Sequence, residues 1–367
     1  MPTDKPLPKY LQLKNEIMSW IKSGKLSPGD RMPTENEIAE RFGISRQTVR
    51  QTFGVLEQEG LLQRMQGKGT YVSSPPARRR EWTNAEKTIG VVTTYISDYI
   101  FPHIVRGAEA AMRSRGYRML LASTDNDKDK ERETLEAMLR QPIAGLIIEP
   151  TRSAEGNPNL DLYLSLDYKR IPYLMINERY PEMTGPYLKV DDEAGGFKAT
   201  EHLIRLGHRR IAGFFKTDDL QGVGRLKGFI RAHQAYEVPL EPDAVVHFAT
   251  RDKTVKPAEA ALGMLMSGEG ERPTAFVCYN DELAIRLLET IRQAGLTVPG
   301  DVSVVGFDDS TLATATEVKL TTLTHPKTDM GTMAAERLID WIEGRADPAP
   351  SHLFEPELIV RDSTGPV

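Results

Sequence analysis

Between Lys9 and Leu56 the apolar residues recur every three or four positions, which is the period of an amphipathic helix. The first such segment begins at Lys9 and ends at Ser23-Gly-Lys25, a sequence that can terminate a helix. The second follows Thr34-Glu-Asn-Glu37 and runs to about Phe42. In that sequence the threonine hydroxyl and the glutamate carboxylate can each satisfy a free backbone amide, as in a capping box. The pattern therefore predicts two short helices at the start of the chain.

A third helix follows after a sharp turn. Gly43 can take the conformation that such a turn needs, and Ser45 is a good N-cap for a helix that ends near residue 60. Residues 61–65 and 70–72 flank the glycine-containing segment 66–69, which predicts a two-stranded hairpin. Helix, glycine turn, helix and hairpin together indicate a winged helix-turn-helix.

From residue 88 onward, short apolar runs alternate with helical patterns. Strands that alternate with helices predict parallel sheets covered on both faces, and about 280 residues in this style predict two sheets rather than one. The predicted strands cover residues 89–93, 119–123, 144–149, 173–177, 211–215, 245–248, 275–279 and 302–307.

Residues 73–87 separate the two patterns. They contain a proline pair, three consecutive arginines and few apolar side chains, which is the composition of a linker. We therefore expect a winged helix-turn-helix domain over 1–72, a linker over 73–87, and a larger α/β domain over 88–367. The predicted fold class is multidomain, with an α+β unit followed by an α/β unit of parallel sheets.

The charge of the chain is divided unevenly between these parts. The whole chain carries a formal net charge of -5, but residues 1–80 carry +6 and the remaining residues carry -11. A cationic head on an anionic body predicts a polyanionic partner at the N-terminal end only.

The single Cys278 excludes a disulfide framework and leaves no thiolate cluster for a metal. The N-terminus has no apolar run after a basic start, so we expect no signal peptide. No stretch approaches the ~20 apolar residues of a membrane span. These features predict a soluble, cytoplasmic protein without a membrane partner.

The start of the third predicted helix carries the side chains suited to DNA. Its apolar face leaves Arg46, Gln47 and Arg50 exposed near the N-terminal end, from which a recognition helix presents its base-contacting residues. Arginine can pair with guanine and glutamine with adenine. The hairpin tip, with Lys68, lacks the spacing of a nucleotide-binding loop, but it can reach phosphate or the minor groove.

These N-terminal motifs resemble the DNA-binding domain of the GntR family of bacterial regulators. The family pattern includes the PG..MPTE.E, FG.SR.TVR and QGKGTYV segments, and the match covers residues 8–72. Glu35 has two interpretations, a contact with DNA or a charge that stabilises the start of its helix. The resemblance implies DNA contacts for Lys9, Glu35, Arg46, Gln47, Arg50, Gln66, Gly67 and Lys68.

The larger domain resembles the LacI and periplasmic sugar-binding type. The motifs that carry this likeness include Gly224-Arg-Leu-Lys-Gly-Phe229, Asn280-Asp281 and Val305-Gly-Phe-Asp-Asp309, and it spans residues 88–362. The resemblance implies one subdomain of residues 88–191 and 326–353 and a second of 192–325 and 354–364. It also implies crossing segments near 189–192, 320–326 and 355, a hinged cleft, and a homodimer.

A sugar needs charged or amide groups aimed at its hydroxyls and an aromatic face against its C–H surface. Arg225, Asn280 and Asp308 lie near the ends of predicted strands, where parallel sheets place ligands. Two positions depart from the family pattern, because Glu178 replaces an arginine of many relatives and His325 replaces a glutamine of several. For Tyr99 and Asp191, a ligand contact and a structural role are both open. The effector-binding residues implied are Asp98, Tyr99, Phe101, Asn177, Glu178, Asp191, Arg225, Asn280, Asp308 and His325.

A GntR reader joined to a LacI-type receptor is similar to the arabinose repressors of spore-forming bacteria, and the Thr93–Pro102, Cys278–Glu282 and Phe354–Ile359 segments carry this closer likeness. It implies a repressor that binds double-stranded operator DNA, is released by L-arabinose and has no cofactor. Another pentose as effector, or activation instead of repression, remains open.

Two other functional classes compete with this interpretation. Parallel α/β sheets also host sugar-modifying enzymes, but the chain has no nucleotide fingerprint, metal-ligand spacing or nucleophile motif. A transport-type sugar-binding protein lacks the cationic head found here. We therefore expect a regulator and not an enzyme.

Overall fold

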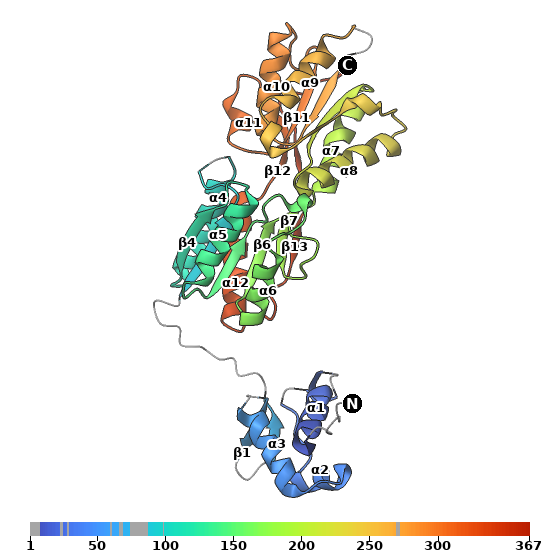
Figure 1. Cartoon of the computed structure of the whole chain (residues 1–367). Helices are drawn as coiled ribbons and strands as arrows, with labels where there is room; N and C mark the ends of the chain where they lie inside the picture. The colour runs from blue at the N-terminus through green and yellow to red at the C-terminus, as the bar shows by residue number, and fades with distance from the viewer. Residues whose placement is uncertain are drawn as a thin grey trace, which may run out of the picture. The chain divides into compact units, whose positions relative to one another are not determined.

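The computed structural model describes residues 8–22, 25–27, 29–58, 61–65, 69–73, 87–97, 99–268 and 272–367. The chain divides into two compact units, residues 1–81 and 82–367 (Figure 1).

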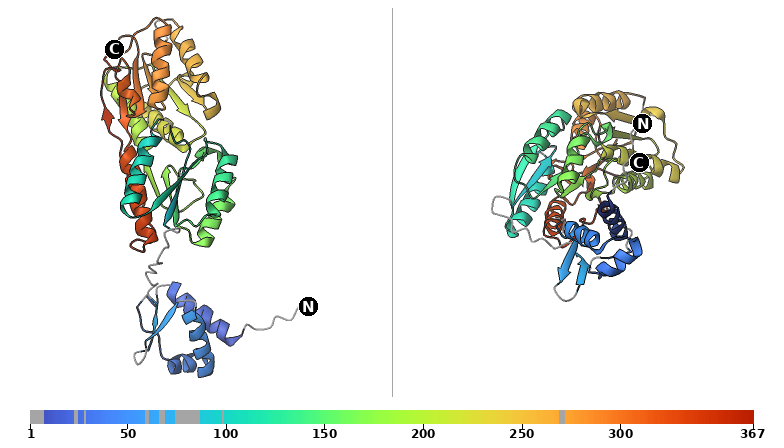
Figure 2. Two further views of the ribbon diagram at one scale, coloured as in Figure 1. Left: turned by 90° about the vertical axis from the view of Figure 1, so that its left-hand side faces the viewer. Right: turned by 60° about the horizontal axis from the view of Figure 1, so that its bottom comes forward.

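The first unit is a winged helix-turn-helix, as predicted (Figure 2). The side chains of Thr34 and Glu37 form the expected capping box at the start of α2, and Gly43 ends that helix in the left-handed conformation with φ +60°. The hairpin is antiparallel, and the Met32 backbone amide donates a hydrogen bond to the Thr70 carbonyl of β2 at 2.8 Å. The elements are α1 (Lys9–Lys22), α2 (Glu35–Phe42), α3 (Arg46–Gln58), β1 (Leu62–Met65) and β2 (Gly69–Val72).

One apolar cluster holds these elements together. Its members on α1 and α3 are residues that the helical spacing placed on the inner faces, and the others come from α2, the segment before it and the two strands. Burying such side chains is the main source of stability for a small unit. The buried cluster contains Leu13, Ile17, Trp20, Met32, Ile38, Val49, Phe53, Leu56, Leu62 and Val72.

Within its described residues the second unit contains two six-stranded sheets. The first has the order β13-β7-β6-β5-β3-β4 and is parallel throughout. We call the part built on it subdomain 1. Its strands are β3 (Thr88–Thr93), β4 (Arg118–Ser123), β5 (Gly145–Ile148), β6 (Tyr173–Asn177), β7 (Tyr187–Val190) and β13 (His352–Phe354), and its helices are α4 (Phe101–Ser114), η1 (Ser153–Glu155), α5 (Lys128–Leu139), α6 (Leu160–Lys169) and α12 (Lys327–Ile342).

The second sheet has the order β14-β12-β11-β10-β8-β9, and β14 alone in it pairs antiparallel among the strands described. We call the part built on it subdomain 2. Its strands are β8 (Ile211–Lys216), β9 (Val245–Phe248), β10 (Ala275–Cys278), β11 (Ser303–Asp308), β12 (Thr321–Thr324) and β14 (Leu358–Ile359). Its helices are α7 (Asp192–Arg205), α8 (Leu220–Ala235), η2 (Pro242–Ala244), η3 (Thr250–Asp252), α9 (Lys256–Leu265), α10 (Asp281–Gln293) and α11 (Leu312–Ala315).

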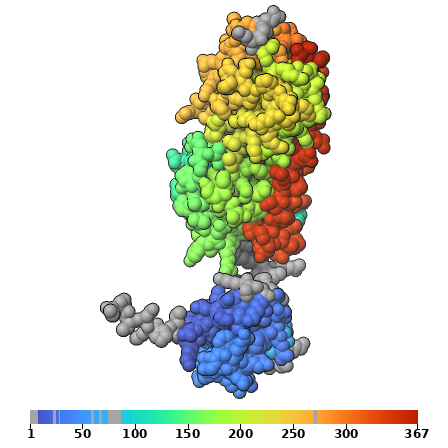
Figure 3. All heavy atoms as spheres, turned by 90° about the vertical axis from the view of Figure 1, so that its right-hand side faces the viewer, coloured from blue at the N-terminus to red at the C-terminus, as the bar shows by residue number. Residues whose placement is uncertain are grey.

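All eight strands predicted from apolar runs are present, with ends within one residue of the prediction. The chain passes between the subdomains three times, after β7, after β12 and between β13 and β14. The C-terminal segment consequently extends along both subdomains (Figure 3). Three adjacent crossings are the usual construction of a hinge about which two subdomains can close.

Glycines allow two helix pairs to pack with their backbones in contact. A Cβ on Gly331 of α12 would lie 2.0 Å from the Ile104 carbonyl oxygen of α4. On α7, a Cβ on Gly196 would lie 2.1 Å from the carbonyl oxygen of Arg225 on α8. This second contact fixes the position of the Arg225 backbone against α7, and so matters for the site described below.

No helix among the described residues is both long and apolar enough to cross a membrane.

Candidate DNA surface and effector cavity

The N-terminal end of α3 presents polar side chains to solvent. The Ser45 hydroxyl accepts a hydrogen bond from the Thr48 amide at 3.2 Å and so caps the helix as expected. Arg46, Gln47 and Arg50 are exposed, while Val49 on the opposite face is fully buried. The arrangement can offer three polar side chains to the edges of bases in a major groove.

Of the other predicted DNA contacts, Lys9 and Glu35 lie among the described residues and three others do not. Lys9 is exposed at the first position of α1. Gln66, Gly67 and Lys68 lie outside the described residues. Glu35 is only partly exposed and forms ion pairs with Arg50 at 3.2 Å and with Arg64 at 2.5 Å. The sequence offered Glu35 as a DNA contact or as a charge that stabilises the start of its helix, and neither interpretation included the ion pairs with Arg50 and Arg64.

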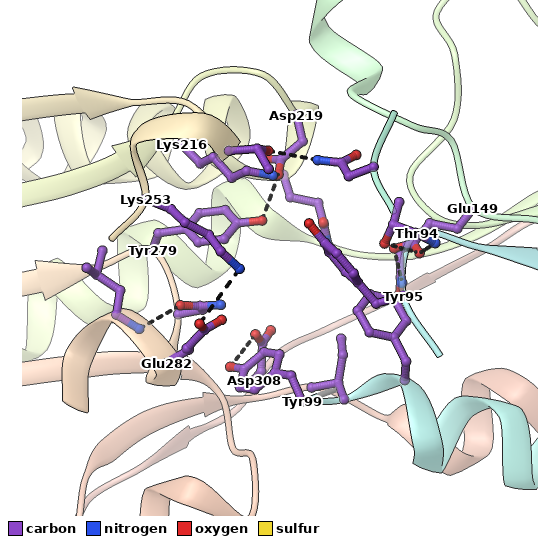
Figure 4. A pocket seen from close by; sticks show the side chains of 18 of the residues that line it. Thr94, Tyr95, Tyr99, Glu149, Lys216, Asp219, Lys253, Tyr279, Glu282 and Asp308 are labelled. Carbon is purple, nitrogen blue, oxygen red and sulfur yellow. Dashed lines mark hydrogen bonds and ion pairs between the residues drawn. The ribbon is translucent and has the colours of Figure 1, made fainter. Parts of the chain in front are cut away.

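A cavity of about 450 Å³ lies between the two subdomains of the second unit (Figure 4). Many of its lining residues lie at or just after the carboxyl ends of parallel strands, the position where such sheets bind ligands. The lining includes Thr94, Tyr95, Ser97, Tyr99, Ile100, Phe101, Asn126, Glu149, Pro150, Ser153, Asn177, Glu178, Lys216, Asp219, Gln221, Arg225, Phe248, Thr250, Lys253, Tyr279, Asn280, Glu282, Leu283, Arg286, Asp308 and Leu312.

Arg225 of α8 lines the cavity from the side of subdomain 2, and only 3% of its side chain is exposed. Its Nε donates to Asp192 Oδ1 at 2.8 Å, its Nη1 to the Tyr279 carbonyl at 2.6 Å, and its Nη2 to Asp308 Oδ1 at 3.4 Å. The guanidinium carbon also lies 3.7 Å from the centroid of the Phe307 ring. Since a guanidinium has five N–H donors, Arg225 keeps unused donors for a ligand in a fixed orientation.

On the side of subdomain 1, a buried carboxylate organises the cavity wall. Glu149 Oε2 accepts from the Thr94 amide at 2.8 Å and the Thr94 hydroxyl at 2.7 Å, and Glu149 Oε1 accepts from Asn177 Nδ2 at 2.7 Å. Burial raises the pKa of Glu149, although these hydrogen bonds oppose the rise. Behind this wall His325 Nε2 lies 3.1 Å from Asn177 Oδ1. Asn177 is therefore oriented from both sides.

On the opposite wall, the positive charge of Lys216 is compensated by two aspartates. Its Nζ donates to Asp219 Oδ2 at 2.9 Å and lies 3.3 Å from Asp218 Oδ1. The Tyr279 hydroxyl donates to the same Asp219 oxygen at 2.8 Å. Burial tends to raise the pKa of Asp219, but Lys216 outweighs this effect and leaves the pKa below its usual value.

The subdomains touch at both edges of the cavity. From subdomain 1, the Tyr99 hydroxyl lies 2.7 Å from Asp308 Oδ2 and accepts from the Asp281 amide at 3.2 Å. At the other edge Asn126 Nδ2 donates to the Thr250 hydroxyl at 2.8 Å, and the Leu220 amide donates to the Ser153 hydroxyl at 2.9 Å. The two subdomains are therefore joined directly by hydrogen bonds around the cavity.

Most of the predicted effector residues come together in this cavity. Those that line it are Tyr99, Phe101, Asn177, Glu178, Arg225, Asn280 and Asp308, and Asp98 lies outside the described residues.

Two of the predicted residues do not line the cavity. The Asp191 side chain accepts from the Ala194 amide at 2.9 Å and so caps α7. His325 is buried behind Asn177. Tyr99, for which a ligand contact and a structural role were both open, lines the cavity, and its hydroxyl lies 2.7 Å from Asp308 Oδ2. Glu178 pairs with Lys189 at 2.8 Å.

Sequence reasoning missed several lining residues that carry polar groups. Thr94, Glu149, Lys216 and Tyr279 each directly follow or end a predicted strand, so the rule that identified Asn280 and Asp308 could also have found them. Asp219, which caps α8, lies one turn further on and carried no comparable signal.

The described cavity wall carries no unpaired positive charge, although two of its basic side chains share Glu282 and the buried Glu149 has no cationic partner. Each basic side chain that lines it has an acidic partner within 4 Å, so no lone cation faces the interior from the described wall. Neither do the described residues form a group that could hold a metal ion. Such a cavity favours a neutral, hydroxyl-rich ligand over a phosphorylated one. The pairs are Lys216–Asp219, Arg225–Asp308, Lys253–Glu282 and Arg286–Glu282.

Comparison with known proteins finds matches for each unit separately and for the chain as a whole. Residues 9–72 match the bacterial regulatory proteins of the gntR family, and residues 200–364 match the periplasmic binding protein-like domain. The chain is 63% identical to the arabinose metabolism transcriptional repressor of Geobacillus stearothermophilus, over 98% of this chain and 99% of that protein. It is 44% identical to the repressor of the same name from Halalkalibacterium halodurans, over 97% and 96% of the two chains.

Among solved structures, the second unit is similar to a LacI family transcriptional regulator from Enterococcus faecium with bound ribose. The TM-score is 0.65 at 25% sequence identity, over 76% of this chain and 99% of that chain.

Proposed function

The chain belongs to the family of arabinose metabolism transcriptional repressors, and we propose that L-arabinose is the effector that binds its cavity and releases it from operator DNA. It is a DNA-binding transcriptional regulator with a GntR-type DNA-binding domain, and not an enzyme. The effector is a sugar, and the proposal concerns which sugar it is and how it acts. DNA binding also leads us to expect that the protein acts in the cytoplasm.

The observation that carries the proposal is the cavity between the subdomains, whose described basic side chains are all paired and whose fixed polar groups lie on opposite walls. Arg225 and Asp308 on one side, and Glu149 and Asn177 on the other, offer donors and acceptors about a space between the subdomains. The ring of Tyr279 is held beside them by its bond to Asp219 and can cover a C–H face of a sugar. A pentose in its pyranose form carries hydroxyls on consecutive ring carbons and has an apolar C–H surface, which suits a site of this kind.

We propose that the sugar acts on DNA through cleft closure. A ligand that contacts both walls stabilises the closed state, because the open state cannot make both sets of contacts. If two chains form a dimer, closure changes the spacing of the two winged helix-turn-helix domains relative to the half-sites. By linkage, the factor by which the sugar weakens operator binding equals the factor by which the operator weakens sugar binding. The corresponding coupling free energy is typically about 1 to 3 kcal/mol.

Reciprocal variants test the division of labour. Arg50→Ala should weaken binding to a duplex from the protein's own promoter by about 1 to 3 kcal/mol and leave L-arabinose binding unchanged. Arg50 is exposed on α3 and is not among the residues that line the cavity. Asp308→Asn should lose sugar binding and keep duplex binding. Gel shifts and calorimetric titrations measure the two affinities. A variant that loses both would argue against independent sites, provided that circular dichroism shows it folded.

A further inference from the structure

A single carboxylate connects the recognition helix to the wing. Glu35, the first residue of α2, uses Oε2 to pair with Arg50 Nη2 on α3 at 3.2 Å. Its other oxygen, Oε1, accepts from Arg64 Nη2 on β1 at 2.5 Å. The three side chains come from three different elements, so the carboxylate fixes the position of one arginine relative to the other.

Glu35 and Arg50 differ in how much of each side chain is exposed, and this difference indicates different roles. Glu35 has 15% of its side chain exposed, whereas Arg50 has 67%. Each Glu35 oxygen already accepts from an arginine, so a cytosine amino group would have to share an oxygen with Arg50 or Arg64. An approaching carboxylate would also be repelled by the phosphates. Arg50, by contrast, gives one nitrogen to Glu35 and keeps the rest of its planar donor group for a base.

Arg64 has a second acidic neighbour, which distinguishes it from Arg50. Its Nε lies 3.8 Å from Glu57 Oε1 near the end of α3, while its Nη2 holds Glu35. Arg64 is thus held between two carboxylates and can keep Glu35 in place when Arg50 bends toward DNA. Arg46 on the same helix has no ion pair with any described residue, so this arrangement is specific to Arg50.

We propose that Glu35 is a positioning residue for operator recognition: it acts through Arg50, whose guanidinium it orients toward a base, and Arg64 anchors it to the wing. The inference rests on the proposed contact between Arg50 and DNA. An arginine side chain has many rotamers, and ordering it on binding reduces affinity. Exposed ion pairs add little to folding stability, so the loss of Glu35 should appear in DNA recognition and not in unfolding.

A double-mutant cycle tests this assignment. Full-length wild type, Glu35→Gln, Arg50→Ala and the double variant are titrated by fluorescence anisotropy with a duplex from the protein's own promoter and with a scrambled duplex. Glu35→Gln should weaken promoter binding about tenfold and change scrambled binding by less than about twofold. In the Arg50→Ala background, Glu35→Gln should have no further effect. Glu35→Asp keeps the charge but is too short to span both arginines, and should behave like Glu35→Gln.

Glu40→Gln is the matched control, because it removes the same charge from an exposed position of the same helix. It should leave both affinities unchanged. An equal loss from Glu35→Gln with and without Arg50 would overturn the proposal and show that Glu35 contacts the duplex itself. Tighter binding of Glu35→Gln to both duplexes would also overturn it, since that result indicates simple charge repulsion. If the wild type bound neither duplex preferentially, the proposed function would fail instead.

Discussion

The wall of the cavity in subdomain 1 depends on one buried acid. Glu149 accepts three hydrogen bonds, two from Thr94 and one from Asn177, and it has no cation of its own within ion-pair distance among the described residues. Its carboxylate therefore fixes two groups that can in turn contact a sugar. The prediction from sequence placed Asn177 in the site but overlooked Glu149, although its position at a strand end could have marked it. The convergence of Thr94 and Asn177 on its carboxylate is visible only in the folded chain.

Glu149→Gln should lower both sugar affinity and stability. One of its amide hydrogens must point at the Thr94 or Asn177 donors, which leaves a buried polar group without a partner at a cost of about 1 to 3 kcal/mol. Calorimetric titration with L-arabinose and urea unfolding measure the two effects. Glu155→Gln, at a more exposed position in η1, serves as the control and should change neither. Unchanged sugar affinity in Glu149→Gln would contradict the role given to this wall.

His325, at the second crossing between subdomains, makes stability depend on pH. Burial lowers its pKa to about 4, which Lys327 and Arg225 reinforce and Asp308 opposes. In the unfolded chain a histidine titrates near 6.5. The unfolded state therefore takes up a proton first, so the contribution is complete above about pH 6.5 and is lost as the pH falls toward 4.

Between pH 7.5 and 5.0 this residue should remove on the order of 2 kcal/mol from the free energy of unfolding. His325→Gln should lack that part of the pH dependence, and the exposed His247→Gln should retain it. Urea unfolding of the full chain at the two pH values, followed by circular dichroism, gives the comparison. Identical pH dependence in wild type and His325→Gln would show that the histidine is not held neutral.

At the level of elements, the strand pattern was predictable and the helix packing was not. An apolar run bounded by polar turns identifies a buried strand from local sequence alone, and β6 and β9 have the predicted bounds. Four short strands were not predicted as strands and appeared only as crossing segments or beside them: β7, β12, β13 and β14. They are two to four residues long and, apart from β14, include polar side chains, which leaves too weak an apolar pattern to identify them. The close approach of α4 to α12 depends on glycines far apart in sequence, and a pattern read along one helix cannot show it.

Gly331→Ala should destabilise the second unit by about 1 to 3 kcal/mol, because the new methyl group meets the backbone of α4 and not a side chain that can move. Gly263→Ala on α9 is a matched control. Nothing lies within 4 Å of its added Cβ, so it should be neutral or up to about 1 kcal/mol stabilising through helix propensity. Thermal unfolding of both variants decides the point, and equal stability of the two would contradict the packing described for α4 and α12.

At the level of the whole molecule, motifs predicted both functional parts, but local sequence could not show how they are assembled. The apolar spacing of α3 predicted which of its faces is exposed, yet the link from Glu35 to Arg50 and Arg64 joins residues of three elements. Likewise Tyr99 and Asp308 are 209 positions apart and meet because subdomain 1 and subdomain 2 lie in contact at the cavity. Contacts between distant segments need the folded chain, and they include the contacts through which one site can influence another.

Sugar-dependent release from DNA is the central claim, and one measurement tests it most directly. The affinity of the full-length protein for a duplex from its own promoter is measured by fluorescence anisotropy at fixed salt, alone and with saturating L-arabinose, D-xylose or D-ribose. We predict that L-arabinose weakens binding roughly 5- to 150-fold, the usual range of allosteric coupling, and that the other two pentoses leave it nearly unchanged. Release by D-xylose or D-ribose but not by L-arabinose, or no change with any of the three sugars, would contradict the account.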